Sequence, residues 1–244
     1  MTDRTARRLA ICIVAATGLF VAAFAVFRLA SRREPHVEVD RTLYPVAGLD
    51  ISAHNGFVDF DSAAAAGIDF VYLKASEGNT FRDTTFRSNC RRARQAGMAV
   101  GAYHFFRFDC DGRRQAMNLL AATDSCRLTL PLVIDIEEWG NPAEVATDVV
   151  IGRLQTMEAM LRGAGHRVMF YTNKNGYWRF VRPAFPEPPH PLLWICSFTD
   201  PPLAGGNWAL WQHSHRGRVP GVPSAADLNT FNGSYAEFLE FLNH

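Results

Sequence analysis

The chain has 244 residues, of which 48% are hydrophobic, and its 25 basic and 24 acidic residues leave a formal charge of +1. This length is sufficient for one large domain with a substantial hydrophobic core. The near-neutral charge and the lack of a basic stripe argue against a nucleic-acid-binding protein.

The N-terminal segment differs from the rest of the chain. Residues 9–27, LAICIVAATGLFVAAFAVF, contain no charged side chain, and crossing a bilayer takes roughly 20 such residues. Three arginines precede this run and three follow it, so the positive-inside rule does not orient it. We expect residues 1–33 to be a short tail and a transmembrane signal anchor, with a signal peptide cleaved near Ala23-Phe24-Ala25 as the alternative.

The remaining chain divides into a polar segment and a patterned one. Residues 34–46 are polar and are predicted to form a linker, and residues 47–244 are predicted to form one domain. Its predicted strands are 47–51, 69–75, 98–106, 130–137, 167–172, 191–198 and 208–213, with 226–231 as a candidate for an eighth. Its predicted helices are 83–96, 111–123 and 142–162.

This alternation indicates an α/β barrel. Strands that are apolar throughout and alternate with helices predict a parallel sheet covered on both faces. About eight strands in roughly 200 residues predict a compact, irregular (β/α) barrel of the TIM-barrel type, with mostly parallel strands. Residues 174–190 and the tail after 213 are less regular, so we expect fewer than eight helices.

Polar residues recur where the predicted strands end, and these residues are Asp50, Lys74, His104, Asp135, Glu137 and Gln212. The carboxyl ends of the strands carry the active site in barrels of this kind. The fold would therefore bring these side chains together, and the pattern predicts an active site at that end of the barrel.

Two acids at the end of the fourth strand suggest the chemistry. In a strand, residues i and i+2 point to the same face, so Asp135 and Glu137 project side by side and Glu138 lies outside the pair. Neighbouring carboxyls raise each other's pKa, and a carboxyl with a raised pKa can act as a general acid, as glycoside hydrolysis requires. The alternatives are a solvated strand end, or a magnesium or calcium site formed with Asp50.

Lys74 and the aromatic residues are candidates for substrate contacts. A lysine within a strand needs a carboxylate partner, either Glu77 or Asp50, unless it reaches solvent from the strand end. His104 also fits a hydrogen-bonded core residue. Aromatic side chains at or near strand ends, some in the core and some able to stack on sugar rings, are Tyr103, Trp139, Tyr171, Trp194 and Trp211.

Five cysteines are consistent with an exported domain. Cys12 lies in the apolar segment, which leaves an even number, Cys90, Cys110, Cys126 and Cys196, for an oxidising compartment. We favour a Cys110–Cys126 disulfide because both residues flank one predicted surface loop and helix. The alternative is that all four are free thiols. The spacing does not suggest zinc.

Six segments in order resemble glycoside hydrolase family 25, the lysozymes of the N-acetylmuramidase type. They are GLDIS at 48–52, FVYLKASEG at 70–78, FRSNCRRARQAGMAVGAYHFFR at 86–107, LPLVIDIE at 130–137, ALWQHS at 209–214 and DLNTFNG at 227–233. The resemblance covers about 47–240. It implies a flattened β/α barrel that cleaves the β-1,4 bond between N-acetylmuramic acid and N-acetylglucosamine in peptidoglycan.

The resemblance also implies roles for individual residues. Glu137 matches the family's general acid/base, and Asp135 matches the aspartate that orients the substrate's 2-acetamido group. Asp50 and Asp227 match the other two carboxylates of the cleft. The acetamide oxygen can replace an enzyme nucleophile, and an inverting route is the alternative. The expected substrate-binding residues are Lys74, Glu77, Tyr103, His104, Tyr171, Trp194 and Gln212.

These features lead to a set of expectations about the whole protein. We expect a monomer without cofactor or metal, held at the bacterial cytoplasmic membrane by residues 9–27 with its domain in the periplasm or at the cell surface, or secreted after cleavage. A chitinase-like enzyme competes with this interpretation, but Leu132, Val133 and Ile134 stand where its acidic run would be. Two interpretations without catalysis also compete: a peptidoglycan-binding module that does not cut, and a purely structural exported domain.

Overall fold

The computed structural model describes residues 37–202 and 208–243. The predicted membrane segment 9–27 and Cys12 lie outside the described residues. Among the residues that are described, no helix is long and apolar enough to cross a membrane. The residues from Val37 onward form one compact unit, in which the end of the predicted linker already takes part: Tyr44 packs against Trp211 with ring centroids 5.9 Å apart.

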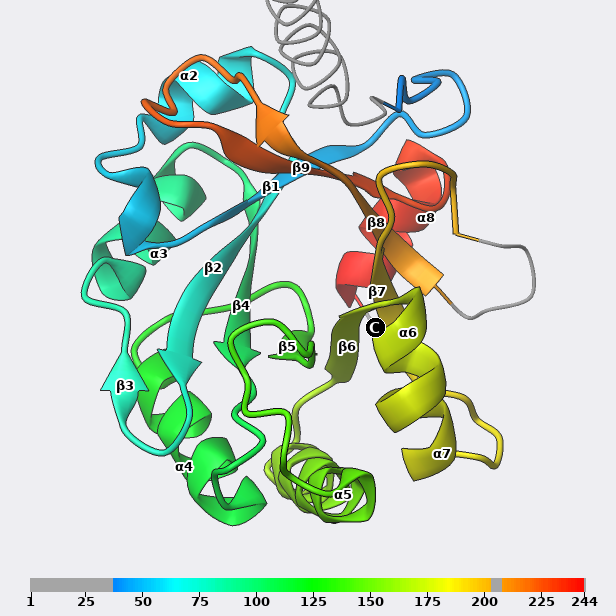
Figure 1. The fold of residues 1–244 in the computed structure, drawn as a ribbon. Coiled ribbons are helices and arrows are strands. Elements are labelled where there is room, and N and C mark those ends of the chain that lie inside the picture. Colours follow the sequence, from blue (N-terminus) through cyan, green and yellow to red (C-terminus); the bar gives the residue numbers. More distant parts are fainter. Residues whose placement is uncertain (1–36, 203–207, 244) are drawn as a thin grey trace, which may run out of the picture. The chain divides into compact units, whose positions relative to one another are not determined.

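The core of this unit is a sheet whose strands correspond to the predicted ones (Figure 1). The strands are β1 (Ala47–Ile51), β2 (Phe70–Glu77), β3 (Phe81–Arg82), β4 (Ala99–Phe105), β5 (Leu132–Asp135), β6 (Val168–Asn173), β7 (Leu192–Cys196), β8 (Trp208–Gly217) and β9 (Ala226–Phe231). The sheet includes the candidate eighth strand of the barrel as β9. The short β3 pairs only with β2 and stands outside the barrel.

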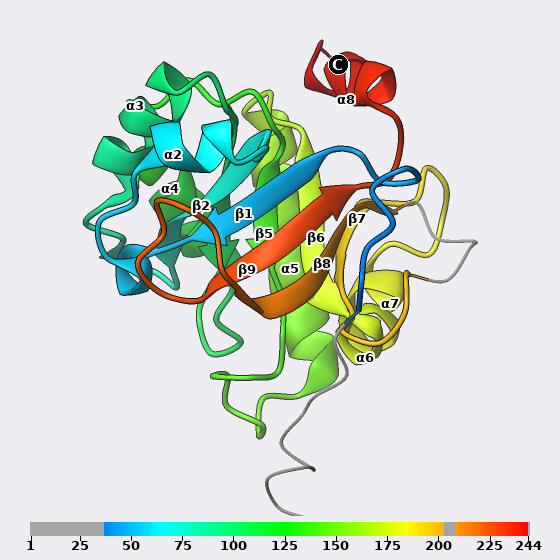
Figure 2. The ribbon, with the colours of Figure 1, turned by 90° about the horizontal axis from the view of Figure 1, so that it is seen from above.

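The sheet closes on itself through β9. Strands β1, β2, β4, β5, β6, β7 and β8 follow one another in parallel. Strand β9 is antiparallel to both β8 and β1, between which it lies in Figure 2. The expected α/β barrel of mostly parallel strands is therefore confirmed, and its one reversed strand places Asp227 directly opposite Asp50.

Helices cover the outside of the barrel, and α8 lies at one end. They are α2 (Phe60–Ala65), α3 (Phe86–Gln95), α4 (Gly112–Thr123), α5 (Thr147–Gly163), α6 (Lys174–Gly176), α7 (Arg182–Ala184) and α8 (Tyr235–Asn243), with short helical turns η1 (Ala53–Asn55) and η2 (Tyr177–Val181). The tail after 213, predicted to be less regular, instead contains the end of β8, β9 and α8. No helix lies between β8 and β9, whose connecting residues are all described.

Apolar residues alternate between the two faces of the sheet, as a barrel requires. Side chains on the outer face pack with the helices, and those on the inner face form a second cluster that includes Tyr72, Val133 and Trp194. Glycine makes room for this inner cluster: a Cβ atom on Gly101 would lie 2.1 Å from the ring of Tyr72. Phe238 of α8 completes the cluster through contacts with Phe70 and Phe231.

The predicted Cys110–Cys126 disulfide is wrong. Cys126 is instead bonded to Cys90, with Cα atoms 6.4 Å apart, and Cys110 and Cys196 are free thiols. Helix α4 stands between Cys110 and Cys126, and its 12 residues span about 18 Å. A disulfide requires Cα atoms within about 7 Å, whereas Cys90 lies on the buried face of α3 near the end of α4.

Candidate active site

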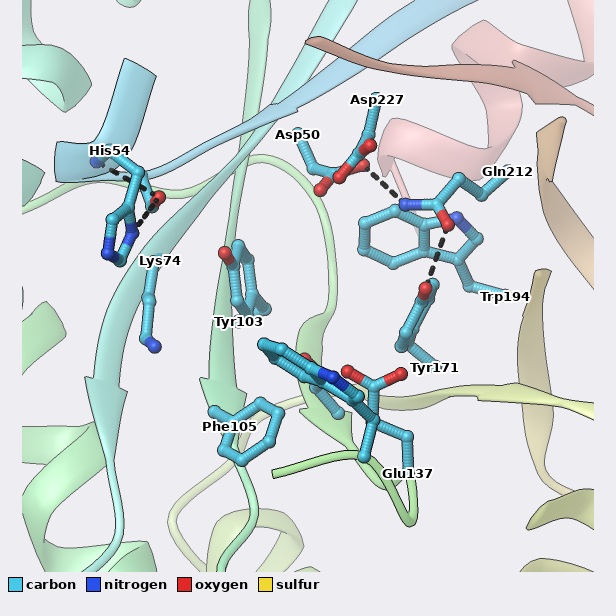
Figure 3. A pocket seen from close by; sticks show the side chains of 13 residues that line it. Asp50, His54, Lys74, Tyr103, Phe105, Glu137, Tyr171, Trp194, Gln212 and Asp227 are labelled. Carbon is cyan, nitrogen blue, oxygen red and sulfur yellow. Dashed lines mark hydrogen bonds between the residues drawn. The ribbon is translucent and has the colours of Figure 1, made fainter. Parts of the chain in front are cut away.

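A pocket of about 230 Å³ opens at the carboxyl ends of the parallel barrel strands and the amino end of β9 (Figure 3). Each of the eight barrel strands contributes one or more residues to it. The lining residues are Asp50, Ser52, His54, Lys74, Tyr103, Phe105, Asp135, Glu137, Trp139, Tyr171, Trp194, Gln212 and Asp227. The structure thus brings together nine of the eleven residues that the sequence analysis proposed for the site.

Asp135 and Glu137 both line the pocket, as their spacing predicts. Ile136 between them is fully buried on the outer, helix-covered side of the sheet. Burial raises the pKa of Glu137 to about 7, and the negative charge of Asp50 adds to this, while Lys74 opposes it. Burial, and then the charge of Glu137, hold the pKa of Asp135 well above its usual range. Both groups can therefore carry a proton near neutral pH.

The next acid in the chain, Glu138, is outside this pair. It forms an ion pair with Arg179 at the surface, where both side chains are about half exposed. Its separation from Asp135 and Glu137 agrees with the sequence analysis.

Asp50 and Asp227 form a second pair of acids, on the other side of the pocket in Figure 3. They lie opposite each other on β1 and β9, and a hydrogen bond joins their carboxyl groups. Burial raises the pKa of both, and the adjacent charge of Asp50 helps to raise that of Asp227 to about 9. A shared proton is the ordinary outcome for two carboxyls this close.

Lys74 is paired with Glu77, one of its two predicted partners. The Lys74 Nζ atom lies 2.7 Å from a carboxylate oxygen of Glu77 and also lies over the rings of Phe81 and Phe105. Glu77 does not line the pocket itself. Its role is to hold Lys74, which lines the pocket. Its Oε1 atom also lies 3.8 Å from Arg107 Nη1.

His104 does not reach the pocket, contrary to its expected part in substrate binding. Its ring is fully buried and lies 2.8 Å from Ser76 Oγ and 3.1 Å from Gln115 Oε1. Burial lowers the pKa of His104 to about 4, so it is neutral. It is a hydrogen-bonded core histidine, the second of the two interpretations that the sequence allowed.

Four lining residues were not among those eleven proposed residues: Ser52, His54, Phe105 and Trp139. Of these, Trp139 had been named only as one of the aromatic side chains able to stack on sugar rings. Period-two alternation from Tyr103 would have identified Phe105. Trp139 follows Glu137 on an exposed loop, and 79% of its surface is exposed, which suits an aromatic side chain that stacks on a sugar. The same alternation from Asp50 would have identified Ser52, whereas sequence pattern carries no comparable signal for His54.

Among residues 37–202 and 208–243, no three histidine, cysteine, aspartate or glutamate side chains are grouped closely enough to hold an ion. One oxygen of Asp135, Oδ1, is buried without a hydrogen-bond partner in this part of the chain. It is an acceptor available to a polar group of a ligand.

Paired carboxyls set among aromatic side chains at the strand ends of a barrel are the groups that glycoside hydrolysis uses. Sequence comparison agrees: a sequence model of glycosyl hydrolases family 25 matches residues 49–222. The chain is 31% identical over 226 residues to "Lysozyme M1" of Streptomyces globisporus, and the matched region covers 84% of this chain and 76% of that protein. The chain belongs to glycosyl hydrolases family 25 and is a glycoside hydrolase.

Further relatives share the domain and its fold. An "N,O-diacetylmuramidase" of Arthroderma benhamiae is 35% identical over 222 residues, which cover 85% of this chain and 91% of that protein. The solved structure of a family 25 glycosyl hydrolase from Bacillus anthracis superposes with a TM-score of 0.76 at 31% identity, covering 86% of this chain and 98% of that one. The closed barrel is therefore the fold of the family.

Proposed function

We propose that this protein is a muramidase, which hydrolyses the β-1,4 bond between N-acetylmuramic acid and N-acetylglucosamine in peptidoglycan. The observation that carries the proposal is the position of Glu137, which lines the pocket together with Asp135 and whose pKa burial raises to about 7. Names such as lysozyme and N,O-diacetylmuramidase among its relatives support the same substrate.

Glu137 is the general acid of the proposed reaction. Its proton would pass to the glycosidic oxygen as the bond to the anomeric carbon breaks. A pKa near 7 keeps that proton in place at neutral pH and still allows it to leave, which is the balance general acid catalysis needs. The deprotonated Glu137 would then take a proton from the incoming water.

Asp135 is proposed to orient the 2-acetamido group of the substrate. Its buried Oδ1 atom has no hydrogen-bond partner in the described part of the chain and can accept the acetamide N–H. This contact would direct the acetamide oxygen to the anomeric carbon, so that the substrate provides its own nucleophile. Asp50 and Asp227 provide the electrostatic environment on the other side of the pocket.

The remaining lining residues support binding. Tyr103, Tyr171 and Trp194 are proposed to contact the sugar rings, and Lys74 and Gln212 to bind their polar groups. Glu77 acts by holding Lys74 in place.

We also propose that the enzyme is a monomer and that residues 9–27, outside the described residues, hold it at the membrane. Alkaline carbonate extraction of membranes would release a secreted form and retain an anchored one.

The proposed acid is tested with Glu137→Gln, which keeps the shape of the side chain but has no acidic proton. We expect the full-length variant to bind isolated peptidoglycan as the wild type does and to lose about 1,000-fold in cleavage rate. Glu138→Gln is the matched control, because Glu138 is paired with Arg179 at the surface. Cleavage by Glu137→Gln at a rate near that of the control would remove Glu137 from this role.

A further inference from the structure

Two buried amide side chains meet on a single oxygen of Asp50. Asn229 Nδ2 lies 2.8 Å and Gln212 Nε2 lies 3.0 Å from Asp50 Oδ2. Both amides are almost fully buried, with exposed fractions of 1% and 4%. Asn229 does not line the pocket, although its side chain contacts Asp50, which does.

The orientation of each amide is set by a further residue. The indole nitrogen of Trp194 donates to Asn229 Oδ1 over 2.8 Å, and an indole N–H can only donate. The Asn229 amide must therefore turn its oxygen to Trp194 and its NH₂ group to Asp50. Tyr171 donates its hydroxyl to Gln212 Oε1 over 2.8 Å, which turns the Gln212 NH₂ group toward Asp50 in the same way (Figure 3).

This arrangement distinguishes the two acids of the pair. An oxygen that accepts two N–H bonds is stabilised as a carboxylate, because hydrogen bonds to the charged form favour it. Asp50 receives both donors. Within the described residues no amide side chain donates to the carboxyl of Asp227, and the pKa of Asp227 lies at about 9. The proton between the two groups therefore belongs to Asp227, and the negative charge belongs to Asp50.

We propose that Asn229 is a positioning residue which, with Gln212, keeps Asp50 as the charged member of the Asp50–Asp227 pair. The proposal rests on the proposed muramidase function and adds a role to it. A fixed charge at Asp50 acts across the pocket on Glu137, whose proton it helps to retain. Asn229 would thus influence the pH at which the general acid works, although it does not contact the substrate.

Several other ionisable groups affect the charges around Asp50. Asp135 at the end of β5 and Glu137 just after it repel a negative charge at Asp50. The positive charge of Lys74 on β2 acts in the opposite sense and lowers the pKa values of Asp135 and Glu137. Three further groups face this cluster from β4, β6 and β7: Tyr103, Tyr171 and Cys196. Burial raises the pKa of all three, that of Cys196 to about 12, so they remain neutral where the acids titrate.

The test compares Asn229→Leu with Asn232→Leu in the full-length protein. Asn232 is an exposed residue beyond the end of β9, and within the described part of the chain its side chain donates only to the carbonyl of Trp208. Without its Asn229 donor, Asp50 should protonate more readily, and Glu137 should lose its proton at a lower pH. We expect the alkaline limb of kcat/KM to move by about one pH unit toward acid in Asn229→Leu and to stay in place in Asn232→Leu.

A second measurement does not depend on cleavage. The ¹³C carboxyl resonances of Asp50 and Asp227, assigned with the Asp50→Asn and Asp227→Asn variants, report the charge of each group as pH changes. We expect Asp50 to be ionised and Asp227 protonated at pH 6 in the wild type, and the titration of Asp50 to move to higher pH in Asn229→Leu. If Asn229→Leu does not fold, Trp194→Phe removes the donor that orients Asn229 and should move the same limb in the same direction.

The outcomes separate the two proposals. A charged Asp227 beside a neutral Asp50 in the wild type would overturn the inference, as would an Asn229→Leu variant that is slower but has unchanged titrations and an unchanged alkaline limb. If the wild type leaves peptidoglycan intact while Asp50 is the charged member of the pair, the muramidase proposal fails and the charge assignment stands.

Discussion

Asp50 differs in charge from the other three acids of the pocket because its neighbours differ from theirs. Glu137 lies partly buried within range of the Asp50 charge, and Asp50 receives two amide donors. Asp227 on β9 lies directly opposite Asp50 on the adjacent, antiparallel β1. At the residue scale, the site is one carboxylate surrounded by three carboxyls that tend to hold their protons.

The first prediction at this scale concerns pH. The proposed acid works only while it is protonated, and the pKa of Glu137 is about 7. We therefore expect kcat/KM to fall as pH rises, with a midpoint near 7, in a series of initial rates on soluble peptidoglycan fragments. A midpoint near 4.5, the ordinary value for a glutamate, would contradict this account of the pocket.

The second prediction concerns the paired aspartates. Asp227→Asn replaces a protonated carboxyl with an amide that can still donate to Asp50, so the charge at Asp50 survives. Asp50→Asn removes that charge. We expect a loss of kcat/KM of roughly tenfold or less for Asp227→Asn and of about 100-fold or more for Asp50→Asn. Equal losses, or the reverse order, would count against the charge assignment.

At the element scale, the site depends on which face of a strand each residue occupies. Tyr103 and Phe105 face the pocket, so His104 between them must face the other side, where Ser76 and Gln115 satisfy it. The alternation was available in the sequence and would have excluded His104. It would also have indicated Asn229, two residues after Asp227. The disulfide could not be found this way, because it depends on how α3 packs beside the end of α4.

The third prediction concerns this disulfide. Cys90 and Cys126 are 36 residues apart, and closing a loop of that length stabilises a protein by about 4 kcal/mol in the chain-entropy estimate. We expect a Cys90→Ser, Cys126→Ser double variant to lose a free energy of unfolding of that order in urea denaturation. The matched variant Cys110→Ser, in which a free half-buried thiol is replaced, should lose less than about 1 kcal/mol. Equal stability of the double variant and the wild type would contradict the assigned pairing.

At the scale of the whole molecule, local sequence pattern predicts most of the barrel but not the direction of its last strand. The apolar strand runs predict its sheet, and polar residues at the strand ends predict its pocket, because both follow from local pattern. The direction of β9 does not follow from local pattern, because a strand of six residues has the same apolar pattern whether it runs parallel or antiparallel to its neighbours. Its reversal places Asp227 opposite Asp50. Local pattern does not predict this pairing, although the family resemblance names both residues as carboxylates of the cleft.

The fourth prediction belongs to the end of the barrel that α8 covers. Phe238 is 2% exposed and packs against Phe70 and Phe231. We expect Phe238→Ala to lower the free energy of unfolding by about 3–4 kcal/mol in chemical denaturation, because it leaves a cavity in the inner cluster. Below its melting temperature the variant should keep the kcat/KM of the wild type. Loss of activity in the folded variant would show that this end is coupled to the pocket.

The identity of the bond that is cut tests the central claim most directly. Peptidoglycan digested by the full-length protein would be reduced with borohydride, and the new ends would be identified by mass spectrometry, with Glu137→Gln as the control. A muramidase must yield fragments that end in reduced N-acetylmuramic acid, and these should be missing from the control digest. Ends in reduced N-acetylglucosamine would mean that the enzyme cuts the other glycosidic bond and would contradict the proposed function.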